Sequence, residues 1–489
     1  MKSRLDRYLD RIDPNQFSVK NPYVPISLFA NDDVPVEVGA IEQIIKFASL
    51  QKTMELLAPY FGECSLERVV LTPDFHEGES GIPIGTVAKT RGFILPQAVG
   101  NDICCGMRLL VTDVTKDELA PHVDRLMPIL RGIFFQGKRE VIMSPRQREA
   151  LLRDGLWGLI ETVGDNRGSG IWRYYDEKIQ EKDLLKVHFQ GNLPTNDIYS
   201  FGDYIKQSGA SDSRDAQAGV LGGNNHFTEL QTIEDVFDGA YGMGLEKNKI
   251  TIMVHTGSVG IGHAVGWFFK DQAIDLYPKH LKRPDHGFFP IPAESNLASA
   301  YLSAMNNAAN FAFGNRMFLG LMVIRALSEV LGREIGSKLV YDAPHNLIWK
   351  NSDGSFIHRK GATPAYKGIP CLVPGSMAAA SYVLEGQGNE AALCSACHGA
   401  GRAISRGKAR HMEDVRFREQ MAPLRVVNPI DPNAPEVRNR RDILKEYDDR
   451  LKEESGDSYK AITPIAATIN DAGIAKTVAK LWPILTIKG

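Results

Sequence analysis

The chain has 489 residues, of which 43% are hydrophobic and 24% are charged. These values are typical of a folded protein with a large core, and they exclude disordered, collagen-like and fibrous chains. Lys and Arg total 57 against 59 Asp and Glu, so the formal net charge of −2 argues against a binder driven by a basic tail. The six cysteines are too few for a disulfide scaffold of this length.

The N-terminal sequence has no apolar segment of the kind that a signal peptide needs. The longest strongly apolar stretch, residues 317–324, is far shorter than a membrane span. No dimerisation element is apparent in the sequence. We therefore expect a cytoplasmic monomer without a membrane partner.

The first half of the chain changes pattern several times. Apolar residues recur at helical spacing over 40–58, and short β-type runs separated by Gly and Pro follow over 65–110. Charged, helix-like sequence returns over 114–165, and residues 250–255 read as a buried strand that ends at a histidine. Strands, turns and helices thus alternate along the chain.

The second half continues this alternation. Residues 295–313 and 317–335 predict two helices that are buried on most sides. Residues 436–454 predict a solvated amphipathic helix, with Ile443, Tyr447 and Leu451 on one face. Residues 481–489 predict a final strand. The whole pattern predicts a mixed α/β (α+β) fold, organised as a single domain over residues 1–489, with central sheets surrounded by helices.

Several common motifs are missing or misleading. Residues 332–338 resemble a phosphate-binding P-loop but lack its G-K-[ST] ending, so any nucleotide must be bound in another way. Residues 394–398 match the C-x-x-C-H pattern of covalent haem attachment. That attachment normally requires export to an oxidising compartment, and no export signal is present. We therefore keep a haem protein only as an alternative.

Five Gly- or Asn-rich loops each carry side chains that can bind a metal. They contain Asp102 with Cys104 and Cys105, then His226, His255, His345 and His398. Together they offer a mixed set of oxygen, sulfur and nitrogen ligands. Such a set suits a transition metal such as Zn or Mn and argues against a Ca or Mg site. A closed structural zinc site is the alternative interpretation.

Basic residues near these loops point to phosphate binding. Lys360 belongs to a His-Arg-Lys run, and Arg402 and Arg406 share one face if a helix follows Gly401. Guanidinium groups bind phosphates through two hydrogen bonds at once. Residues 374–377 and 398–401 form Gly-containing turns, and the second turn is expected to open a helix whose N-terminus favours anions. A solvated basic face is the alternative.

Nine motifs together make the chain resemble the RtcB family of GTP- and metal-dependent RNA ligases. They are PDFHEG with GIPIG (73–85), GNDICCGMRL (100–109), GGNNHFTELQ (222–231), HTGSVGIGH (255–263), HN (345–346), HRKGAT (358–363), PGSMAAASYVL (374–384), CHGAGRAISR (397–406) and the terminal KG. These motifs occur in family order from about residue 70 to the end. Residues 1–60 and 114–215 carry little of the resemblance.

The resemblance implies an enzyme that joins RNA ends with a 3′-phosphate or 2′,3′-cyclic phosphate to ends with a 5′-hydroxyl. It implies that His398 attacks the α-phosphate of GTP and becomes a GMP-histidine. It also implies two Mn²⁺ ions, with Cys105 bridging them. The implied metal ligands are Asp102, Cys105, His226, His255 and His345.

The resemblance further implies the residues that contact the guanylate. These are Asn225, His226, Phe227, Thr228, Glu229, His345, Asn346, Pro374, Gly375, Ser376, Met377, Ser381, His398, Gly399, Ala400, Gly401 and Lys488. Lys360, Arg402 and Arg406 are then candidates for the RNA backbone, where contacts position a substrate without reading its sequence. Members of the family often work with a small activator protein called archease, and they act in RNA repair or tRNA splicing.

Four sites depart from the family pattern. Val259 stands where the family usually has Arg, Cys104 stands where Asn is common, Glu79-Ser80 replaces the more usual aromatic/Gly pair before GIPIG, and Pro344 precedes His345. Because the metal ligands and His398 are retained, we expect activity on a different RNA, in a divergent repair branch. The alternatives are an enzyme that guanylylates RNA 3′-ends without efficient joining, a non-catalytic metalloprotein, and an RNA-binding factor without turnover.

Overall fold

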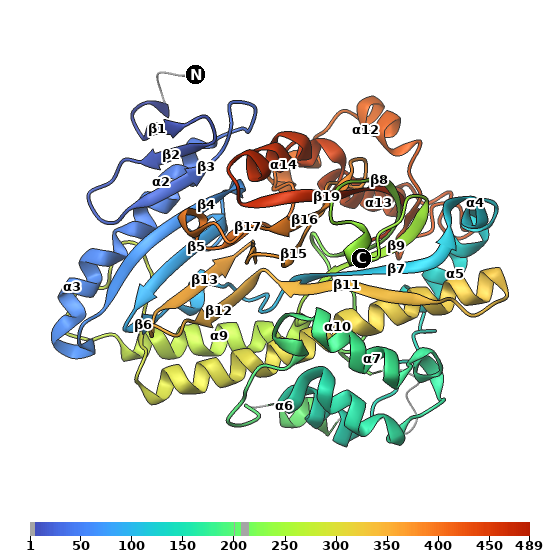
Figure 1. The fold of residues 1–489 in the computed structure, drawn as a ribbon, viewed down its shortest axis with the longest axis horizontal. Helices are drawn as coiled ribbons and strands as arrows, with labels where there is room; N and C mark the ends of the chain where they lie inside the picture. The colour runs from blue at the N-terminus through green and yellow to red at the C-terminus, as the bar shows by residue number, and fades with distance from the viewer. Residues whose placement is uncertain (1–4, 200, 207–214) are drawn as a thin grey trace.

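Two large β-sheets form the centre of the computed structural model, which describes residues 5–199, 201–206 and 215–489 (Figure 1). The first sheet has seven strands in the order β1-β2-β3-β4-β5-β13-β12. Their bounds are β1 (Leu9–Asp13), β2 (Gln16–Val19), β3 (Ile26–Phe29), β4 (Ser65–His76), β5 (Ile84–Arg91), β13 (Phe356–Lys360) and β12 (Asn346–Lys350). The N-terminal 60 residues, which carry little of the family resemblance, thus complete this sheet.

The second sheet has eight strands and follows the order β11-β7-β9-β8-β19-β16-β15, with β18 paired to β19. Their bounds are β11 (Ser337–Pro344), β7 (Gly106–Thr115), β9 (Lys249–Thr256), β8 (Phe227–Val236), β19 (Ala475–Ile487), β16 (Ser381–Gly386), β15 (Pro370–Val373) and β18 (Val426–Val427). Two further pairs are β6 (Phe93–Ile94) with β10 (Ile291–Pro292) and β14 (Ala362–Pro364) with β17 (Ser395–Cys397). All of these pairings are antiparallel except β3–β4 and β18–β19.

Helices surround both sheets, which confirms the predicted mixed α/β class (Figure 1). They are α2 (Val38–Ala48), α3 (Leu50–Phe61), α4 (Lys116–Leu119), α5 (Val123–Phe135), α6 (Pro145–Thr162), α7 (Glu177–Asp183), α8 (Gly202–Ile205), α9 (Val259–Leu276), α10 (Asn296–Leu331), α11 (Arg406–Ala409), α12 (Asp414–Met421), α13 (Arg441–Glu453) and α14 (Ile462–Asp471). In Figure 1, α9 and α10 run along one side of the sheets, while α12, α13 and α14 lie on the other.

The eight-stranded sheet is covered on both faces. Along β7, Met107 and Leu109 contribute to a smaller hydrophobic cluster, while Leu110 contributes to the main one. This alternation follows from the two-residue period of a strand. The main cluster also contains residues of α10 and of the seven-stranded sheet, so it connects the two sheets across the molecule.

One prediction is wrong: the two helices predicted over 295–313 and 317–335 are one long helix, α10 (Asn296–Leu331). The two predicted helices left out residues 314–316, which are Gly, Asn and Arg. The structure uses each of them for packing. A Cβ on Gly314 would lie 2.7 Å from Leu151 of α6, so only glycine lets the two helices approach this closely. The Asn315 amide donates to Val220 O at 2.9 Å, and Arg316 is buried in a salt bridge.

By length and composition α10 could also cross a membrane, but 89% of its apolar window is buried inside the fold. That degree of burial is typical of a core helix.

The charged helix α13 begins at residue 441 and is only partly solvated. Its Leu451 is buried, and Tyr447 packs beside it against Met377, Phe417 and Val426. The prediction of an amphipathic helix is therefore confirmed, and its apolar face covers Met377, one of the residues implied in guanylate binding.

Candidate functional site

The strand register of the eight-stranded sheet brings the predicted metal ligands together. Met107 of β7 and Phe227 of β8 both pair with His255 of β9. Pro344, the last residue of β11, pairs with Gly106, the first residue of β7. The residues that adjoin these strand ends must therefore meet at one end of the sheet. They are Cys105, His226 and His345.

The ligand atoms form two groups that share one thiol. Cys105, His255 and His345 make the first group, and Asp102, Cys105 and His226 make the second. Cys105 Sγ lies 3.4 Å from His226 Nε2 and 3.2 Å from His255 Nε2. His255 Nε2 lies 3.3 Å from His345 Nε2, and His226 Nε2 lies 2.8 Å from Asp102 Oδ2. A thiolate at this shared position could bridge two cations. We call these five residues the metal cluster.

The chemistry of these donors fits a divalent transition metal. Burial, followed by the neighbouring histidines, holds the pKa of His255 and His345 well below the usual value, so both rings are neutral and keep a lone pair. Burial and Asp102 raise the pKa of the Cys105 thiol well above 9.0, and a bound cation would reverse this. Among the described residues, Asp102 Oδ1 is a buried oxygen without a hydrogen-bond partner. The residues present therefore suit Mn or Zn.

A buried ion pair beneath the cluster holds its loops in place. Arg316 of α10 donates to Cys104 O at 2.7 Å and to Thr256 O at 3.0 Å. Its Nε also donates to Asp342 at 2.9 Å, and Asp342 accepts a second bond from Arg108 at 3.1 Å. Sequence reasoning missed this support, although an arginine inside an apolar helix was a visible signal.

Cys104 itself is a packed core residue and belongs to neither ligand group. Burial raises its pKa to about 11.

His398 lies beside the metal cluster and is oriented by Asp74. It follows β17, and its ring centroid lies 4.8 Å from that of His345. His398 Nδ1 lies 2.6 Å from Asp74 Oδ2, and Thr72 Oγ1 donates to Asp74 Oδ1 at 2.6 Å. Burial alone would raise the pKa of Asp74, yet the bonded imidazole holds it below its usual value. With Nδ1 engaged, Nε2 is the ring nitrogen that remains for chemistry.

Asp74 lies in the PDFHEG motif, but its role was not predicted from the sequence. The signal was a carboxylate in a stretch, residues 69–75 of β4, that is otherwise uncharged.

The same histidine belongs to the C-x-x-C-H pattern, which does not behave as a haem site here. Cys397 is fully buried in the main hydrophobic cluster. The Cys394 thiol lies 3.4 Å from Glu390 Oε1, to which it donates. Because Cys397 packs into the core, the two thiols do not share an accessible face on which haem could be attached.

Several of the residues implied in guanylate binding form one polar chain. Glu229 accepts a hydrogen bond from Gln231 Nε2 at 2.7 Å, and Gln231 also donates to Ser381 Oγ at 2.8 Å. Ser381 Oγ in turn accepts from Gly375 N at 3.2 Å. Burial raises the pKa of Glu229 to about 7.

The turn after β17 adjoins this chain, because a Cβ on Gly399 would lie 3.4 Å from Pro374. The β8, β16 and β17 segments are thus neighbours.

Three predicted cations converge on a carboxylate that sequence reasoning missed, Glu454. Its oxygens lie 3.3 Å from Arg402, 3.4 Å from Arg406 and 3.1 Å from Lys488. The side chain of Glu454 is 6% exposed. It comes just after α13, in a charged segment where nothing distinguishes it from neighbouring acids. We call Glu454 and its three partners the Glu454 cluster.

The cations of this cluster differ in how fully they are engaged. Lys488 Nζ also donates to His226 O at 3.0 Å and to Asn224 O, so it secures the loop of a metal-cluster residue. Arg402 donates to Glu453 O at 2.7 Å, and its guanidinium lies 5.1 Å from the Tyr459 ring centroid. The side chain of Arg406 is 30% exposed. Among the described residues, its one ion pair is the contact with Glu454.

The predicted helix after Gly401 is wrong. Gly401 has a φ of 70°, and Arg402 forms an isolated bridge with Tyr459. The helix α11 begins only at Arg406 and has four residues. Arg402 and Arg406 therefore meet through Glu454 and not along a helix face.

Lys360, which was predicted to contact the RNA backbone, is buried. It lies in β13, between β12 and β5 in the seven-stranded sheet, and is 8% exposed. Its ammonium donates to Ile82 O at 2.7 Å and to Ser80 Oγ at 2.5 Å. Burial lowers its pKa to about 7. The basic run at 358–360 gave no sign of this position inside a sheet, and the RNA contact of Lys360 stays a prediction.

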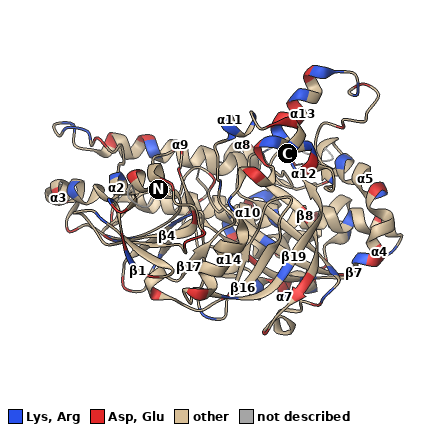
Figure 2. Ribbon diagram, turned by 90° about the horizontal axis from the view of Figure 1, so that it is seen from above, with Lys and Arg blue, Asp and Glu red and all other residues tan. Residues whose placement is uncertain are grey.

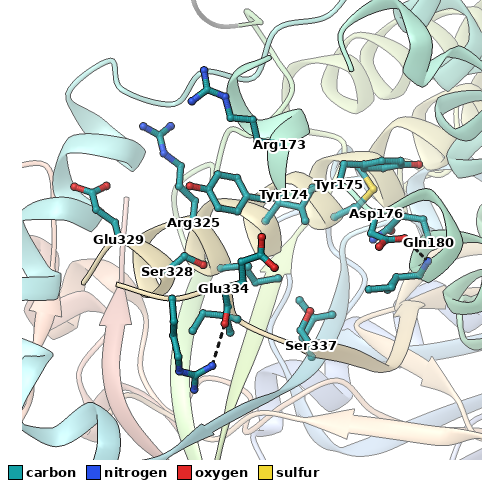
Figure 3. Close-up of a pocket in the computed structure, with 18 of the residues that line it drawn as sticks. Arg173, Tyr174, Tyr175, Asp176, Gln180, Arg325, Ser328, Glu329, Glu334 and Ser337 are labelled. Carbon is teal, nitrogen blue, oxygen red and sulfur yellow. Dashed lines mark hydrogen bonds between the residues drawn. The ribbon is translucent and has the colours of Figure 1, made fainter. Parts of the chain in front are cut away.

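A cavity of about 1000 Å³ lies apart from this site (Figure 3). Residues of β7, β11, α7, α10 and η4 (Gly170–Tyr174) line it, and its lining includes none of the predicted site residues. Figure 3 shows the Tyr174 ring beside Arg325 at the rim of the cavity, with Arg173 above it and Asp176 on the other side. Arg325 at this rim is already paired with Glu140 at 3.3 Å.

Comparison with known proteins agrees with the geometry. Residues 63–489 match the family model described as "tRNA-splicing ligase RtcB". The chain is 32% identical to the "tRNA-splicing ligase RtcB" of Thermococcus kodakarensis, over 93% of this chain and 95% of that protein. It is 30% identical to the protein of the same name from Nanoarchaeum equitans, over 99% of both chains.

A eukaryotic relative also matches. It is the "RNA-splicing ligase RtcB homolog 1" of Entamoeba dispar, which is 32% identical over 85% of this chain and 78% of that protein. With these matches and the site described above, the chain belongs to the RtcB family of RNA ligases.

Proposed function

We propose that this protein joins RNA 3′-phosphate or 2′,3′-cyclic phosphate ends to 5′-hydroxyl ends, using GTP and Mn²⁺. The observation that carries the proposal is the position of His398, whose Nδ1 is held by Asp74 while its ring lies beside the metal cluster. A neutral imidazole with one nitrogen fixed is a competent nucleophile near pH 7. Family membership supports the same reaction class.

The first step forms a bond between His398 Nε2 and the α-phosphorus of GTP, and pyrophosphate leaves. Asp74 accepts the hydrogen bond of Nδ1–H, so the lone pair stays on Nε2 and the positive charge that develops on the ring is stabilised. Metal ions at Asp102, Cys105, His226, His255 and His345 would neutralise phosphate charge. In the later steps they would also help activate the attacking oxygen. The guanylate would lie against the polar chain of Glu229, Gln231 and Ser381.

The next two steps use the energy of the phosphoramidate. An oxygen of the RNA 3′-phosphate attacks the phosphorus of the GMP-histidine, and the His398 nitrogen leaves. The 5′-hydroxyl then attacks the activated 3′-phosphate, and GMP leaves as the phosphodiester forms. A cyclic phosphate must first be opened by water to a 3′-phosphate. Arg406 forms one ion pair and is partly exposed, so its guanidinium can also donate to an RNA phosphate. Arg402 and Lys488 instead hold the surrounding loops.

The test is incubation with α-labelled GTP and Mn²⁺, followed by denaturing electrophoresis of wild type and His398→Ala. We expect label on the wild type and none on the variant. Absence of label on folded, metal-loaded wild type, also after addition of an archease-type activator, would contradict the proposal. Adding RNA with 3′-phosphate and 5′-hydroxyl ends should then release GMP and yield a joined product.

Val259 favours a second candidate function, guanylylation of RNA 3′-ends without efficient joining. It begins α9, beside the loop of Asp102, and its side chain packs against the main hydrophobic cluster. No cation is offered at this position to hold an incoming RNA phosphate. Accumulation of RNA that carries a 3′-guanylate, without joined product, would favour this candidate. Joining by wild type at a rate equal to that of Val259→Arg would exclude it.

A further inference from the structure

The outer face of α9, a helix whose first residues adjoin the loop of Asp102, carries two exposed aromatic side chains. Trp267 is 56% exposed and Phe268 is 51% exposed. Gly260, His263 and Ala264 are the exposed residues of the two turns before them. We call these five residues the aromatic face of α9. No described part of the chain covers them to the degree expected of core aromatics, so the fold does not account for their exposure.

The two rings rest on a rigid base. Phe268 meets Phe269 at a ring-centroid distance of 5.0 Å, and Phe269 is 1% exposed. Phe269 in turn packs against the buried Tyr301 of α10 at 5.4 Å. Lys270 Nζ lies 5.2 Å from the ring centroid of Trp267. Rings held in this way can receive a flat partner without first being ordered.

The inner face of α9 is held tightly against the loop that carries Asp102 and Cys105. A Cβ on Gly266 would lie 2.4 Å from Asn101 Oδ1, and one on Gly262 would lie 3.0 Å from Asn101 O. Ser258, just before the helix, donates its hydroxyl to Ile103 O at 2.6 Å. The aromatic face therefore keeps a fixed position relative to the metal cluster. Figure 2 shows α9 along the same edge of the molecule as α11, which begins with Arg406.

The charge of this face suits a polyanion over a limited length. From residue 260 to residue 268 it carries no carboxylate, and Lys270 flanks Trp267. The first exposed acids on α9 are Asp271 and Asp275, one and two turns farther from the metal cluster. An RNA strand that starts at the metal cluster would thus pass Gly260, His263 and Ala264, then the two aromatic rings, and then the negative charge of the two acids.

We propose that the aromatic face of α9 is a stacking platform for unpaired nucleotides next to the RNA end that is joined. The proposal rests on the proposed function, because it takes the reacting phosphate to lie at the metal cluster. Eight residues of helix separate Val259 from Trp267, about 12 Å at a rise of 1.5 Å per residue. Stacked nucleotides advance about 3.4 Å each, so the rings meet the third or fourth nucleotide from the end. The platform accepts any base, because stacking does not read base edges.

The experiment compares two RNA substrates that have the same reacting ends. In one, the last six nucleotides before the junction are unpaired, and in the other a complementary strand pairs all but the last nucleotide. The variant is Trp267→Ala/Phe268→Ala, and Trp157→Ala is the matched control, because Trp157 is 45% exposed on α6. Trp267→Phe keeps a stacking ring and serves as the conservative variant.

We expect the double variant to raise KM for the unpaired substrate by about tenfold, because both stacking rings are lost. KM for the paired substrate, kcat at saturating RNA and self-guanylylation by GTP should stay unchanged. Trp267→Phe should recover most of the affinity, and Trp157→Ala should match wild type. RNA with an unpaired end should also quench the tryptophan fluorescence that Trp267 contributes in wild type. Trp267→Phe should lose this fluorescence.

Three outcomes would overturn the proposal. The first is an unchanged KM for the unpaired substrate, and the second is an equal loss for both substrates. The third is unchanged RNA affinity with a change in oligomeric state by light scattering, which would make this face a protein contact. Self-guanylylation without RNA reports on the proposed function separately. If wild type took up no label but bound unpaired RNA through Trp267, the platform would stand and the proposed function would fail.

Discussion

The metal cluster and the Glu454 cluster lie side by side, but their polar groups are compensated in opposite ways. In the metal cluster, nitrogen and sulfur atoms approach within 3.2–3.4 Å, and among the described residues no Lys or Arg forms an ion pair with a member of the cluster. In the Glu454 cluster, one buried carboxylate already partners three cations. The first arrangement would be stabilised by an external cation, whereas the second already contains its own cations. Lys488 connects the two through His226 O, so a structural cluster supports a chemical one.

The sharpest test of this difference is Cys105→Ala, which removes the atom that both ligand groups share. We expect loss of Mn²⁺ binding at both positions and loss of guanylylation, because each group falls to two ligands. Mn²⁺ content after gel filtration and labelling with α-labelled GTP measure the two effects. Cys104→Ala is the control, since Cys104 is packed in the core and should leave both readouts intact. Full activity of Cys105→Ala would show that the metal assignment is wrong.

Asp74→Asn should leave the metal cluster loaded but slow the formation of GMP-histidine by about 10²–10⁴-fold. The amide cannot hold the tautomer in which Nε2 of His398 is unprotonated, and it cannot stabilise the imidazolium. Single-turnover labelling at saturating GTP measures the rate, and Mn²⁺ content provides the comparison. A variant with normal rate would mean that Asp74 only supports packing.

Glu454→Gln should mainly lower the stability of the fold and not the rate of the reaction, because it leaves Arg402 and Lys488 buried without a carboxylate partner. We expect a loss of about 3 kcal/mol in the free energy of unfolding, measured by chemical denaturation. Neighbouring cations hold the pKa of Glu454 below its ordinary value of 4.5, despite burial. Its contribution is therefore fully present above about pH 4.5 and is lost as the pH falls through the lower, folded-state pKa.

The difference in stability between wild type and Glu454→Gln should accordingly shrink on acidification. A difference that grew toward low pH would contradict this account of the cluster.

Arg406→Ala should have the smallest effect on stability, below about 1 kcal/mol, because its side chain is 30% exposed and makes one long contact. It should instead raise KM for RNA by about tenfold, the effect of losing one charge-assisted phosphate contact. Arg402→Ala is the contrasting variant, because Arg402 is engaged with the backbone and with Tyr459. We expect it to lower the melting temperature more than Arg406→Ala does. The reverse order would show that the two arginines have been assigned the wrong roles.

The parts of the site that could be predicted are those in which one residue type and its close neighbours carry the chemistry. Cys, His and Asp in Gly- and Asn-rich loops identified the candidate metal ligands, and the loops proved to be neighbours in the structure. The parts that were missed are partners from distant segments. Asp74 orients a histidine 324 positions away, and Glu454 partners a lysine 34 positions away. Local sequence contains no information about such pairs, because each depends on which strands lie next to each other.

Local sequence by itself predicted helical sequence over 40–58, 114–165 and 436–454, short strands over 65–110, and the strands at 250–255 and at the end of the chain, since periodicity and turn residues act over a few positions. It also determined the candidate ligand types and the family resemblance. The tertiary structure alone decided that Gly314 and Arg316 lie inside a continuous helix and that Lys360 is buried in a sheet. It alone decided that Arg402 and Arg406 meet at Glu454. In each case the deciding energy comes from burial or from an ion pair between segments far apart in the chain, and a local pattern cannot register either.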